Sequence, residues 1–414
     1  MFVYNIFLKI YKFLAYILAF MGSTKAKLWR KGQEGIFENL QKYMPCKGQL
    51  VWFHCASVGE FEQARPVLEA FKEQYPSFFI LLTFFSPSGY ELRKNYEYAD
   101  YVSYLPLDNS KDAKKFLDIT KPSIIFWVKY EFWYHFLSKA YQKKIPIILF
   151  SAIFREKQLF FKPYGKFYRE ILSFFSAILV QDENSQKLLA NIHIKAEIAY
   201  DTRFDRVFQI AEQNRDIHRI EEFRNEEKIL ILGSAWQQEI NLLKNFLQIF
   251  KEPLKIIIAP HEINKKEITL LKQELGKEQT ILFSEISQEK DISTYTHLIV
   301  DNVGYLSALY RYADFAFVGG GFKQGLHNIL EPATFALPIF FGNKAYQKFR
   351  EARELLELQG AFAIADAADF LEKFSKLYHD VQLWQKASEI SRNYVKSHLG
   401  GTNRVLEQVK TIIF

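Results

Sequence analysis

Short apolar runs of strand length alternate with amphipathic stretches of helical spacing along most of this chain. In the first half the predicted strands lie at residues 50–54, 78–84, 101–105, 124–128, 145–150 and 176–180. In the second half they lie at residues 229–232, 254–259, 280–283, 298–300, 315–318 and 338–341. Strands that alternate with helices indicate parallel sheets with helices on both faces, so the pattern predicts an α/β protein with two domains.

Charged side chains dominate between residues 201 and 228, and we expect the chain to cross from one domain to the other there. The predicted parts are 1–21 (an N-terminal helix), 22–205 (the first domain), 206–395 (the second domain) and 396–414 (a last helix). The helix at 396–414 could cross back and pack on the first domain.

The loops that follow the predicted strands are where a ligand is expected, because open α/β sheets bind ligands at the carboxyl ends of their strands. Two halves of similar size place a cleft between them, and the loops of both halves should face it. The loops concerned follow Phe53, Val128, Leu232, Pro260 and Val318.

The first twenty residues form a separate apolar segment with three polar interruptions, Asn5, Lys9 and Lys12. At about 100° per residue these three lie on one helical stripe. Four basic residues follow: Lys25, Lys27, Arg30 and Lys31. A cleaved signal would carry its charge before the apolar region. The pattern predicts a helix in the membrane interface, or a short tilted span whose lysines reach the surface. A helix buried in the globular body is the alternative.

Composition and charge narrow the class of protein. The chain has 414 residues, of which 49% are hydrophobic and 24% charged, so it can form two or three packed domains. A net charge of +7 suits an anionic partner, either a membrane surface, a phosphorylated lipid or a nucleic acid. Cys46 and Cys55 form neither a disulfide framework nor a metal-ligand spacing, which is compatible with a cytoplasmic location.

The segment from Ala316 to Gly342 has the order strand, glycine turn, helix start, strand. Such a turn presents bare N–H groups and a positive helix end to an anion, and Pro332 fits the first helical turn. The polar and glycine positions are Gly319, Gly320, Gly321, Gly325, His327, Asn328 and Glu331. We predict a phosphate and ribose site here. The alternative is a glycine turn that only packs a helix against a sheet.

The sequence Ser57-Val58-Gly59-Glu60 follows the first strand and begins a helix. A helix N-terminus tends to keep a carboxylate ionised, which suits Glu60 as a general base. The same residues also fit an S-x-x-E capping box, in which Ser57 and Glu60 only stabilise the helix start.

Other strand-end residues offer weaker signals. Glu131, among aromatic residues, could orient an acceptor or hold a backbone turn. Arg155 could meet an anionic group, and Arg203 could do likewise or pair with Asp201 or Asp205.

In the second half, Gly233 and Ser234 could bind phosphate, while Glu239 could pair within its helix. His261, after Pro260, could contact a base or be structural. The sequence contains no G-x-G-x-x-G, P-loop or G-x-S-x-G motif, so dehydrogenase, kinase and α/β-hydrolase functions lose their main support.

Together, and in this order, these motifs resemble the Kdo transferase family of lipopolysaccharide biosynthesis (3-deoxy-D-manno-octulosonic acid transferase). The motifs are His54 to Glu60, Glu131-Phe132-Trp133, Gly233-Ser234, Pro260-His261, Asp301 to Gly304, and Phe317 to Pro332. The likeness runs from about residue 27 to residue 360 and includes the 201–205 segment and the membrane anchor. It implies a GT-B fold, with two Rossmann-like domains facing across a cleft. It also implies an enzyme on the cytoplasmic face of the inner membrane.

The resemblance implies that CMP-Kdo is the donor, a lipid A precursor (lipid IVA) is the acceptor, and no nucleic acid is a partner. Glu60 would be the catalytic base of an inverting transfer. Acceptor binding falls to Ser57, Gly59, Glu131 and Arg155. Donor binding falls to Arg203, Gly233, Ser234, Pro260, His261, Gly320, Gly321, His327, Asn328 and Glu331. N–H groups around Gly233-Ser234 and Gly320-Gly321 would hold the departing phosphate. No metal and no cofactor is expected, because helix ends can stabilise the charge of a single departing phosphate.

Several positions depart from the family pattern, mostly on the nucleotide side. Pro260 and His261 are adjacent, without the arginine that the family places between them. The other departures are Ala235, Trp236, Gly325-Leu326, Tyr130 and Ser151.

Two alternative functions share some of these features. Another GT-B enzyme, such as a lipid-linked hexosaminyl transferase or a nucleotide-sugar epimerase, would share the second-half site but would not need S-V-G-E with E-F-W. A membrane-anchored nucleotide-binding module would bind ligand without turnover.

Overall fold

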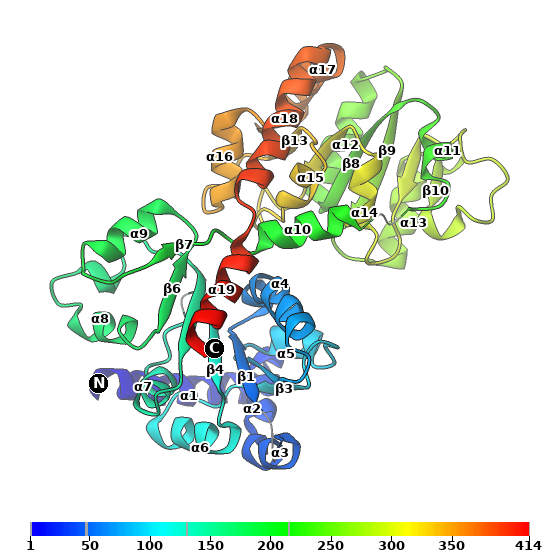
Figure 1. Cartoon of the computed structure of the whole chain (residues 1–414). Coiled ribbons are helices and arrows are strands. Elements are labelled where there is room, and N and C mark those ends of the chain that lie inside the picture. Colours follow the sequence, from blue (N-terminus) through cyan, green and yellow to red (C-terminus); the bar gives the residue numbers. More distant parts are fainter. Residues whose placement is uncertain (1, 46–48, 130, 214–215, 414) are drawn as a thin grey trace. The chain divides into compact units, whose positions relative to one another are not determined.

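The computed structural model describes residues 2–45, 49–129, 131–213 and 216–413, and Cys46 and Tyr130 lie outside them. The chain divides into two compact units (Figure 1). The first comprises Met1–Arg206 and Leu399–Phe414, and the second Val207–His398. Each unit has its own parallel sheet and its own core.

The described part of the first unit has one parallel sheet with the strand order β3-β2-β1-β4-β5-β6-β7. The strands are β1 Leu50–Cys55, β2 Phe79–Phe84, β3 Tyr101–Tyr104, β4 Ile124–Val128, β5 Ile147–Ala152, β6 Ala177–Val180 and β7 Glu197–Ile198. The predicted strands of this half are all present. β7 was not predicted, because two residues, one of them charged, give no apolar run.

Helices cover both faces of this sheet. They are α1 Phe2–Phe20, α2 Thr24–Gln33, α3 Ile36–Tyr43, α4 Val58–Gln74, α5 Pro87–Arg93, α6 Ser110–Thr120, α7 Tyr134–Gln142, α8 Lys166–Leu172, α9 Glu183–Ala190 and α19 Gly401–Ile413, with a short 3-10 turn η1 Leu159–Phe161. α10, Arg203–Glu212, runs from the first unit into the second.

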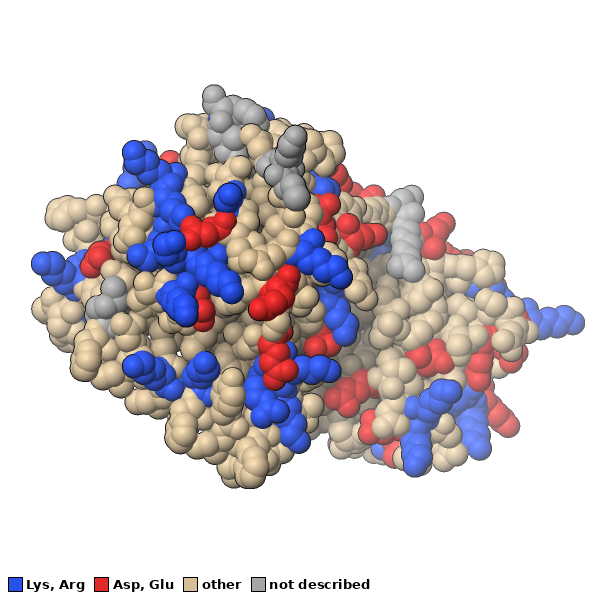
Figure 2. All heavy atoms as spheres, turned by 90° about the horizontal axis from the view of Figure 1, so that it is seen from below, with Lys and Arg blue, Asp and Glu red and all other residues tan. Residues whose placement is uncertain are grey.

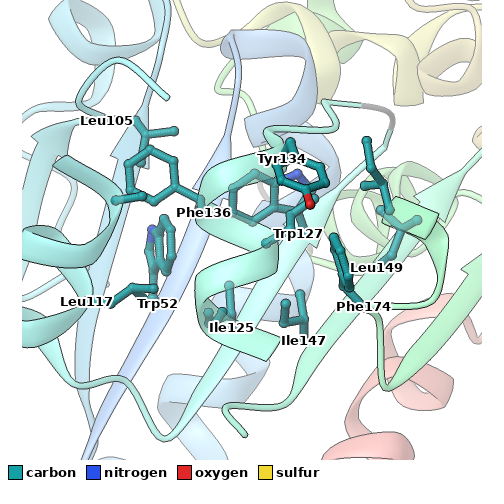
Figure 3. Close-up of a cluster of buried hydrophobic side chains, with 14 of the residues drawn as sticks. Trp52, Leu105, Leu117, Ile125, Trp127, Tyr134, Phe136, Ile147, Leu149 and Phe174 are labelled. Atoms are coloured by element: carbon teal, nitrogen blue, oxygen red, sulfur yellow. The ribbon is translucent and has the colours of Figure 1, made fainter. Parts of the chain in front are cut away.

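Alternation along the strands of the first unit divides its core into two layers. Trp52 of β1 and Trp127 of β4 pack with Phe136 of α7, as Figure 3 shows. Val51 and Phe53 point to the other face, where α4 and α19 cover them. Truncating a fully buried Phe to Ala typically costs about 3–5 kcal/mol, so these layers hold the strand-end loops on a stable base.

α19 returns the end of the chain to the first unit, where Val405, Leu406 and Val409 enter the same core layer as Phe53. The carboxylate of Asp205 accepts the N–H groups of Gly400 (2.7 Å) and Thr402 (2.6 Å) and so caps this helix.

α1 lies along the first unit. Tyr4 donates its hydroxyl to Asp108, Asn5 bonds to the ring of His135 (2.7 Å), and Leu8 and Ala19 are buried. Of the three polar residues on the predicted stripe, Asn5 contacts the first unit, while Lys9 and Lys12 are exposed.

The described part of the second unit has a parallel sheet with the strand order β10-β11-β9-β8-β12-β13-β14. The strands are β8 Lys228–Ala235, β9 Leu254–Pro260, β10 Thr280–Leu282, β11 His297–Ile299, β12 Phe315–Val318, β13 Ile339–Gly342 and β14 Ala361–Ile364. The helices are α11 Ile220–Arg224, α12 Gln237–Ile249, α13 Lys265–Glu274, α14 Leu306–Leu309, α15 Leu330–Thr334, α16 Arg350–Leu358, α17 Ala367–His379 and α18 Val381–Ser397. The predicted strands are present, and β14 is an addition.

Candidate active site

In the first unit, the neighbouring strands β1 and β4 lead to opposite faces of the sheet. β1 is followed by α4 on one face, and β4 by α7 on the other. At such a switch point the two strand-end loops diverge and leave a crevice, which is where α/β sheets bind ligands. The loops at this point carry Ser57 to Glu60 and Glu131.

Ser57 is the N-cap of α4, and its hydroxyl oxygen accepts the N–H of Gly59 at 3.3 Å. The same hydroxyl donates to the carboxylate of Glu60. A full capping box would instead have Glu60 accept the backbone N–H of Ser57. Ser57 thus caps the helix by itself, and the Glu60 carboxylate, held by the Ser57 hydroxyl, remains partly exposed.

Glu131 is the second carboxylate of this crevice. Burial, and then the negative charge of Glu60, raise the pKa of Glu131 to about 7. The two carboxylates therefore lie within electrostatic reach of each other. The backbone carbonyl of Glu131 accepts the indole N–H of Trp127, so this residue also holds a turn, as the alternative interpretation proposed.

The two arginines differ in their surroundings. Arg155, at the end of β5, is exposed, and its backbone N–H donates to Gln158 at 2.8 Å. Arg203 belongs to the first unit and pairs with Asp201 at 2.9 Å. Burial alone would raise the pKa of Asp201, but the charge and hydrogen bonds of Arg203 outweigh it and the pKa is lowered. Asp201 is thus one of the two predicted partners of Arg203, and Asp205 caps α19.

The second unit has its own switch point, between β8 and β12. Gly233 lies opposite Val318 in the sheet, and the N–H of Gly319 donates to the carbonyl of Gly233 at 2.9 Å. A Cβ at Gly233 would lie 2.0 Å from the hydroxyl oxygen of Tyr310, so this position requires glycine. Ser234, near the end of β8, is in the left-handed region at φ 52°, where the register between β8 and β9 shifts.

Glu239 joins the two loops of this switch point. Its buried carboxylate accepts the N–H of Trp236 at 3.0 Å and that of Gly320 at 3.0 Å. Burial raises the pKa of Glu239, and these backbone donors partly oppose that effect. The predicted pairing of Glu239 within its helix is confirmed at the helix start, where Glu239 accepts the N–H of the N-cap Trp236. The Gly320 N–H donates to Glu239 in this structure, and its contact with a phosphate stays a prediction.

Gly321 allows the glycine turn to pack closely against the end of β13. A Cβ there would lie 2.5 Å from the backbone nitrogen of Gly342, and the Gly321 carbonyl accepts the N–H of Ala345 at 2.7 Å. The close packing offered as the alternative for this turn is therefore present at Gly321, and its phosphate role stays a prediction.

Glu331 is held in place by two donors. The hydroxyl of Ser307 donates to one carboxylate oxygen at 2.5 Å, and the amide of Asn328 to the other at 3.1 Å. The helix α15 starts at Leu330, later than the cluster of polar residues suggested. Ser307 had not been singled out, and no local signal marks it, since it lies 24 residues from Glu331.

An aromatic stack lies beside these loops. The rings of Trp236 and His261 are parallel to within 22°, with centroids 4.1 Å apart, and His327 is 4.6 Å from His261. The indole N–H of Trp236 donates to Nε2 of His327 at 3.1 Å, which requires a neutral histidine. Burial, and then the neighbouring His261, lower the pKa of His327 accordingly.

Trp236 and His261 also line a cavity of about 440 Å³ between α12 and α13, together with Pro260. Its size is within the roughly 300–1,000 Å³ of small-molecule sites. Trp236 was noticed only as a departure from a family pattern, and its position directly after β8 was the available signal. Among the described residues, no group of three or more His, Cys, Asp or Glu could hold a metal ion.

Comparisons with known proteins agree with this architecture. A family model described as "3-Deoxy-D-manno-octulosonic-acid transferase (kdotransferase)" matches residues 32–206. The chain is 29% identical over 376 residues to the 3-deoxy-D-manno-octulosonic acid transferase of Aquifex aeolicus, covering 87% of this chain and 97% of that protein. It is 26% identical over 418 residues to the protein of that name from Haemophilus influenzae, covering 95% of each.

Two solved structures share the fold at low identity. The UDP-GlcNAc 2-epimerase of Neisseria meningitidis, bound to UDP-GlcNAc, has a TM-score of 0.60 and 13% identity, covering 88% of this chain and all of that chain (100%). MurG of Acinetobacter baumannii has a TM-score of 0.57 and 11% identity, covering 88% and 99%. With the two parallel sheets, these neighbours confirm the predicted GT-B fold, whereas the cleft between the domains stays a prediction.

Proposed function

We propose that the chain, which is similar to 3-deoxy-D-manno-octulosonic acid (Kdo) transferases over most of its length, moves Kdo from CMP-Kdo onto a lipid A precursor, lipid IVA, with inversion. The observation that supports this most directly is the pair of carboxylates, Glu60 and Glu131, at the switch point of the first unit. The second unit supplies the nucleotide side through its own switch point.

Glu60 is the general base in this proposal. It takes the proton of an acceptor hydroxyl as the hydroxyl oxygen forms a bond to the anomeric carbon of Kdo. The bond between that carbon and the phosphate oxygen breaks, and CMP leaves with the electron pair. The Ser57 hydroxyl donates to Glu60 and orients the carboxylate. The reaction requires the acceptor bound by the first unit to reach the donor bound by the second, and this approach is part of the proposal.

Glu131 binds and orients the acceptor. With a pKa of about 7 it is present in both protonation states near neutral pH, so it can donate a hydrogen bond to the acceptor or accept one from it. Arg155, exposed at the end of the neighbouring β5, is available for a negatively charged group of the same acceptor.

The donor side uses binding groups rather than a base. Glu331, held by Ser307 and Asn328, suits the ribose hydroxyls, and we assign the phosphate to the end of β8 at Gly233-Ser234. The stack of Trp236, His261 and His327 offers an aromatic surface of the kind that holds a nucleobase.

Membrane attachment falls to α1, which is long and apolar enough to cross a membrane. Its outer face is exposed and apolar, with Phe2 77%, Phe13 65% and Phe20 91% accessible. Because its inner face is docked on the first unit along its length, we propose that α1 lies in the interface rather than crossing it. Basic side chains lie among acidic ones on the face seen in Figure 2, and the basic residues that follow α1 in the sequence, Lys25, Lys27, Arg30 and Lys31, suit anionic lipid at the cytoplasmic side.

Turnover tests the function. Purified protein incubated with CMP-Kdo and a tetra-acylated lipid A precursor should yield products heavier by whole Kdo units, with release of CMP. CMP binding without any product would support the non-catalytic module instead, and conversion of a UDP-sugar in place of CMP-Kdo would support the other GT-B enzymes.

Deletion of residues 1–21 tests the anchor. The truncated protein should move from the membrane to the soluble fraction yet retain turnover on detergent-dispersed acceptor. A truncated protein that still sediments with membranes would contradict the assignment of α1.

A further inference from the structure

A cavity of about 430 Å³ lies in the first unit between α1, α2 and the loop that follows β2. Most of its walls are apolar: Leu14, Ala15, Leu18, Ala26, Trp29 and Phe85. Its volume is typical of a small-molecule site. None of the groups assigned to the transfer reaction lines it.

One side of this cavity is continuous with the outer face of α1. Leu14 and Leu18 line the cavity and are also about half exposed, at 50% and 51%, among the apolar side chains of that helix. A hydrocarbon chain could therefore enter from a lipid phase without crossing polar surface. Lys25 also lines the cavity and can remain near polar headgroups.

The opposite wall is tied to both loops of the carboxylate pair. The ring of Phe85 lies 4.6 Å from that of Trp133, two residues after Glu131. The next residue, Ser86, donates its N–H to the carbonyl of Ala56 at 2.8 Å, directly before Ser57. The cavity thus lies between the membrane helix and the crevice to which the acceptor sugar is assigned.

Trp29 supplies an unused polar group. Its side chain is buried and lines the cavity, and among the described residues its indole N–H has no hydrogen-bond partner. A buried donor without a partner is unfavourable, and the carbonyl of an acyl linkage would satisfy it.

We propose that this cavity binds one fatty acyl chain of the lipid acceptor, the group being linked through an ester or amide carbonyl. The inference rests on the proposed function, because it assigns a subsite to the acceptor of that reaction. The acceptor, rather than bulk lipid, is the occupant because the cavity wall is joined to the Glu60 and Glu131 loops. A chain held there places the attached sugar beside them.

Filling the cavity is the first test. Ala26→Trp adds an indole to the cavity wall, and Phe13→Trp places one on the outer face of α1, away from the cavity, as the control. We expect Ala26→Trp to raise the KM for the acylated acceptor by about tenfold, because several CH₂ groups lose their apolar contacts. The KM for the deacylated sugar acceptor, the KM for CMP-Kdo and flotation with vesicles should be unchanged.

An unchanged KM of folded Ala26→Trp for the acylated acceptor would overturn the proposal. An equal rise with the deacylated acceptor would overturn it too, since the effect would then not concern the chain. If wild type transfers Kdo to neither acceptor, the proposed function itself fails, which is a different result from either of these.

The second test measures the fluorescence of the wild-type chain, with Trp29→Phe as the reference for the signal of Trp29, and separates the two sources of acyl groups. The fluorescence of Trp29 is the part of the tryptophan signal that is absent in Trp29→Phe. Acceptor with brominated acyl chains should quench this part, and an excess of unbrominated acceptor should reverse the quenching. Brominated phosphatidylcholine at the same concentration should not quench it. Quenching by phosphatidylcholine alone would assign the cavity to bulk lipid, and no quenching by either would leave it without an acyl ligand; both outcomes overturn the proposal.

Discussion

The two units use the same part of the same topology for different chemistry. In both, the chain switches face between two neighbouring parallel strands, β1 and β4 in one and β8 and β12 in the other. At the first switch point the loops present carboxylate side chains, partly open to solvent. At the second they present glycines, an aromatic stack and a carboxylate whose partners are already in place.

This difference follows from what each site must do. A group that moves a proton needs a titratable side chain that is open to the substrate. The first switch point has two partly exposed carboxylates, Glu60 and Glu131, and the charge of Glu60 contributes to the raised pKa of Glu131. A site that only binds gains affinity when its groups are already in position, because less ordering is needed on binding. Hydrogen bonds of Glu239, Ser307 and Asn328 hold the second site in this way. Changes at the first site should therefore affect turnover, and changes at the second should affect binding.

The largest effect should come from Glu60→Gln. The amide oxygen can still accept from Ser57, so the helix start is kept, but it cannot take a proton. Turnover should fall on the order of 10²–10⁴-fold, while the CMP affinity measured by calorimetry stays the same. Glu73→Gln, an exposed position at the other end of α4, is the control and should keep full activity. Near-normal turnover of Glu60→Gln would end its assignment as base.

Glu239→Ala should have the next largest effect, on the stability and CMP binding of the second unit. It leaves the N–H groups of Trp236 and Gly320 without their acceptor, at a cost of about 1–3 kcal/mol for each buried donor. We expect a lower unfolding midpoint of the second unit in urea and weaker CMP binding. Gln238→Ala, exposed in the same helical turn, should change neither. A stable Glu239→Ala with normal CMP affinity would contradict the bridging role.

Local pattern was sufficient for the strands and for the carboxylates that directly follow them. Glu60 and Glu131 could be predicted because each comes a few residues after an apolar run, and parallel strands bring their ends to one edge. The bridge from Glu239 to Gly320 could not, because it joins residues 81 positions apart. The same holds for the bond from Trp236 to His327, across 91 positions.

The glycine turn shows a further limit of sequence reasoning. A glycine needed for close packing and a glycine needed to present an N–H to phosphate look the same in sequence. The packing of Gly321 against Gly342, and the bond from the Gly320 N–H to Glu239, become visible only in the structure.

Glu331→Ala should weaken CMP binding by roughly 1–3 kcal/mol, since it removes the acceptor proposed for the ribose hydroxyls. Calorimetry at constant salt measures this, with Glu357→Ala, exposed on α16, as the control. A comparison of CMP with 2′-deoxy-CMP sharpens the result, because the variant should lose most of the discrimination between them. Equal affinities of wild type and variant for CMP would remove Glu331 from the ribose role.

The smallest expected effect is a pH dependence of stability caused by Glu131. Its pKa in the folded protein, about 7, lies above the ordinary value of 4.5, so between these values the folded state binds a proton more tightly than the unfolded chain. Its contribution to stability is fully present below about pH 4.5 and is lost as the pH rises through 7. Glu131→Gln cannot ionise, so its thermal midpoint relative to wild type should rise between pH 5 and pH 8.

The same measurement tests the coupling of the two carboxylates. Because the negative charge of Glu60 contributes to the raised pKa of Glu131, Glu60→Gln should lower that pKa, although burial keeps it above 4.5. In the Glu60→Gln background, the increase in thermal midpoint caused by Glu131→Gln should therefore begin at lower pH and be smaller. If the effect of Glu131→Gln is the same with and without Glu60→Gln, the carboxylates do not interact, and the first switch point holds two independent acids rather than one coupled pair.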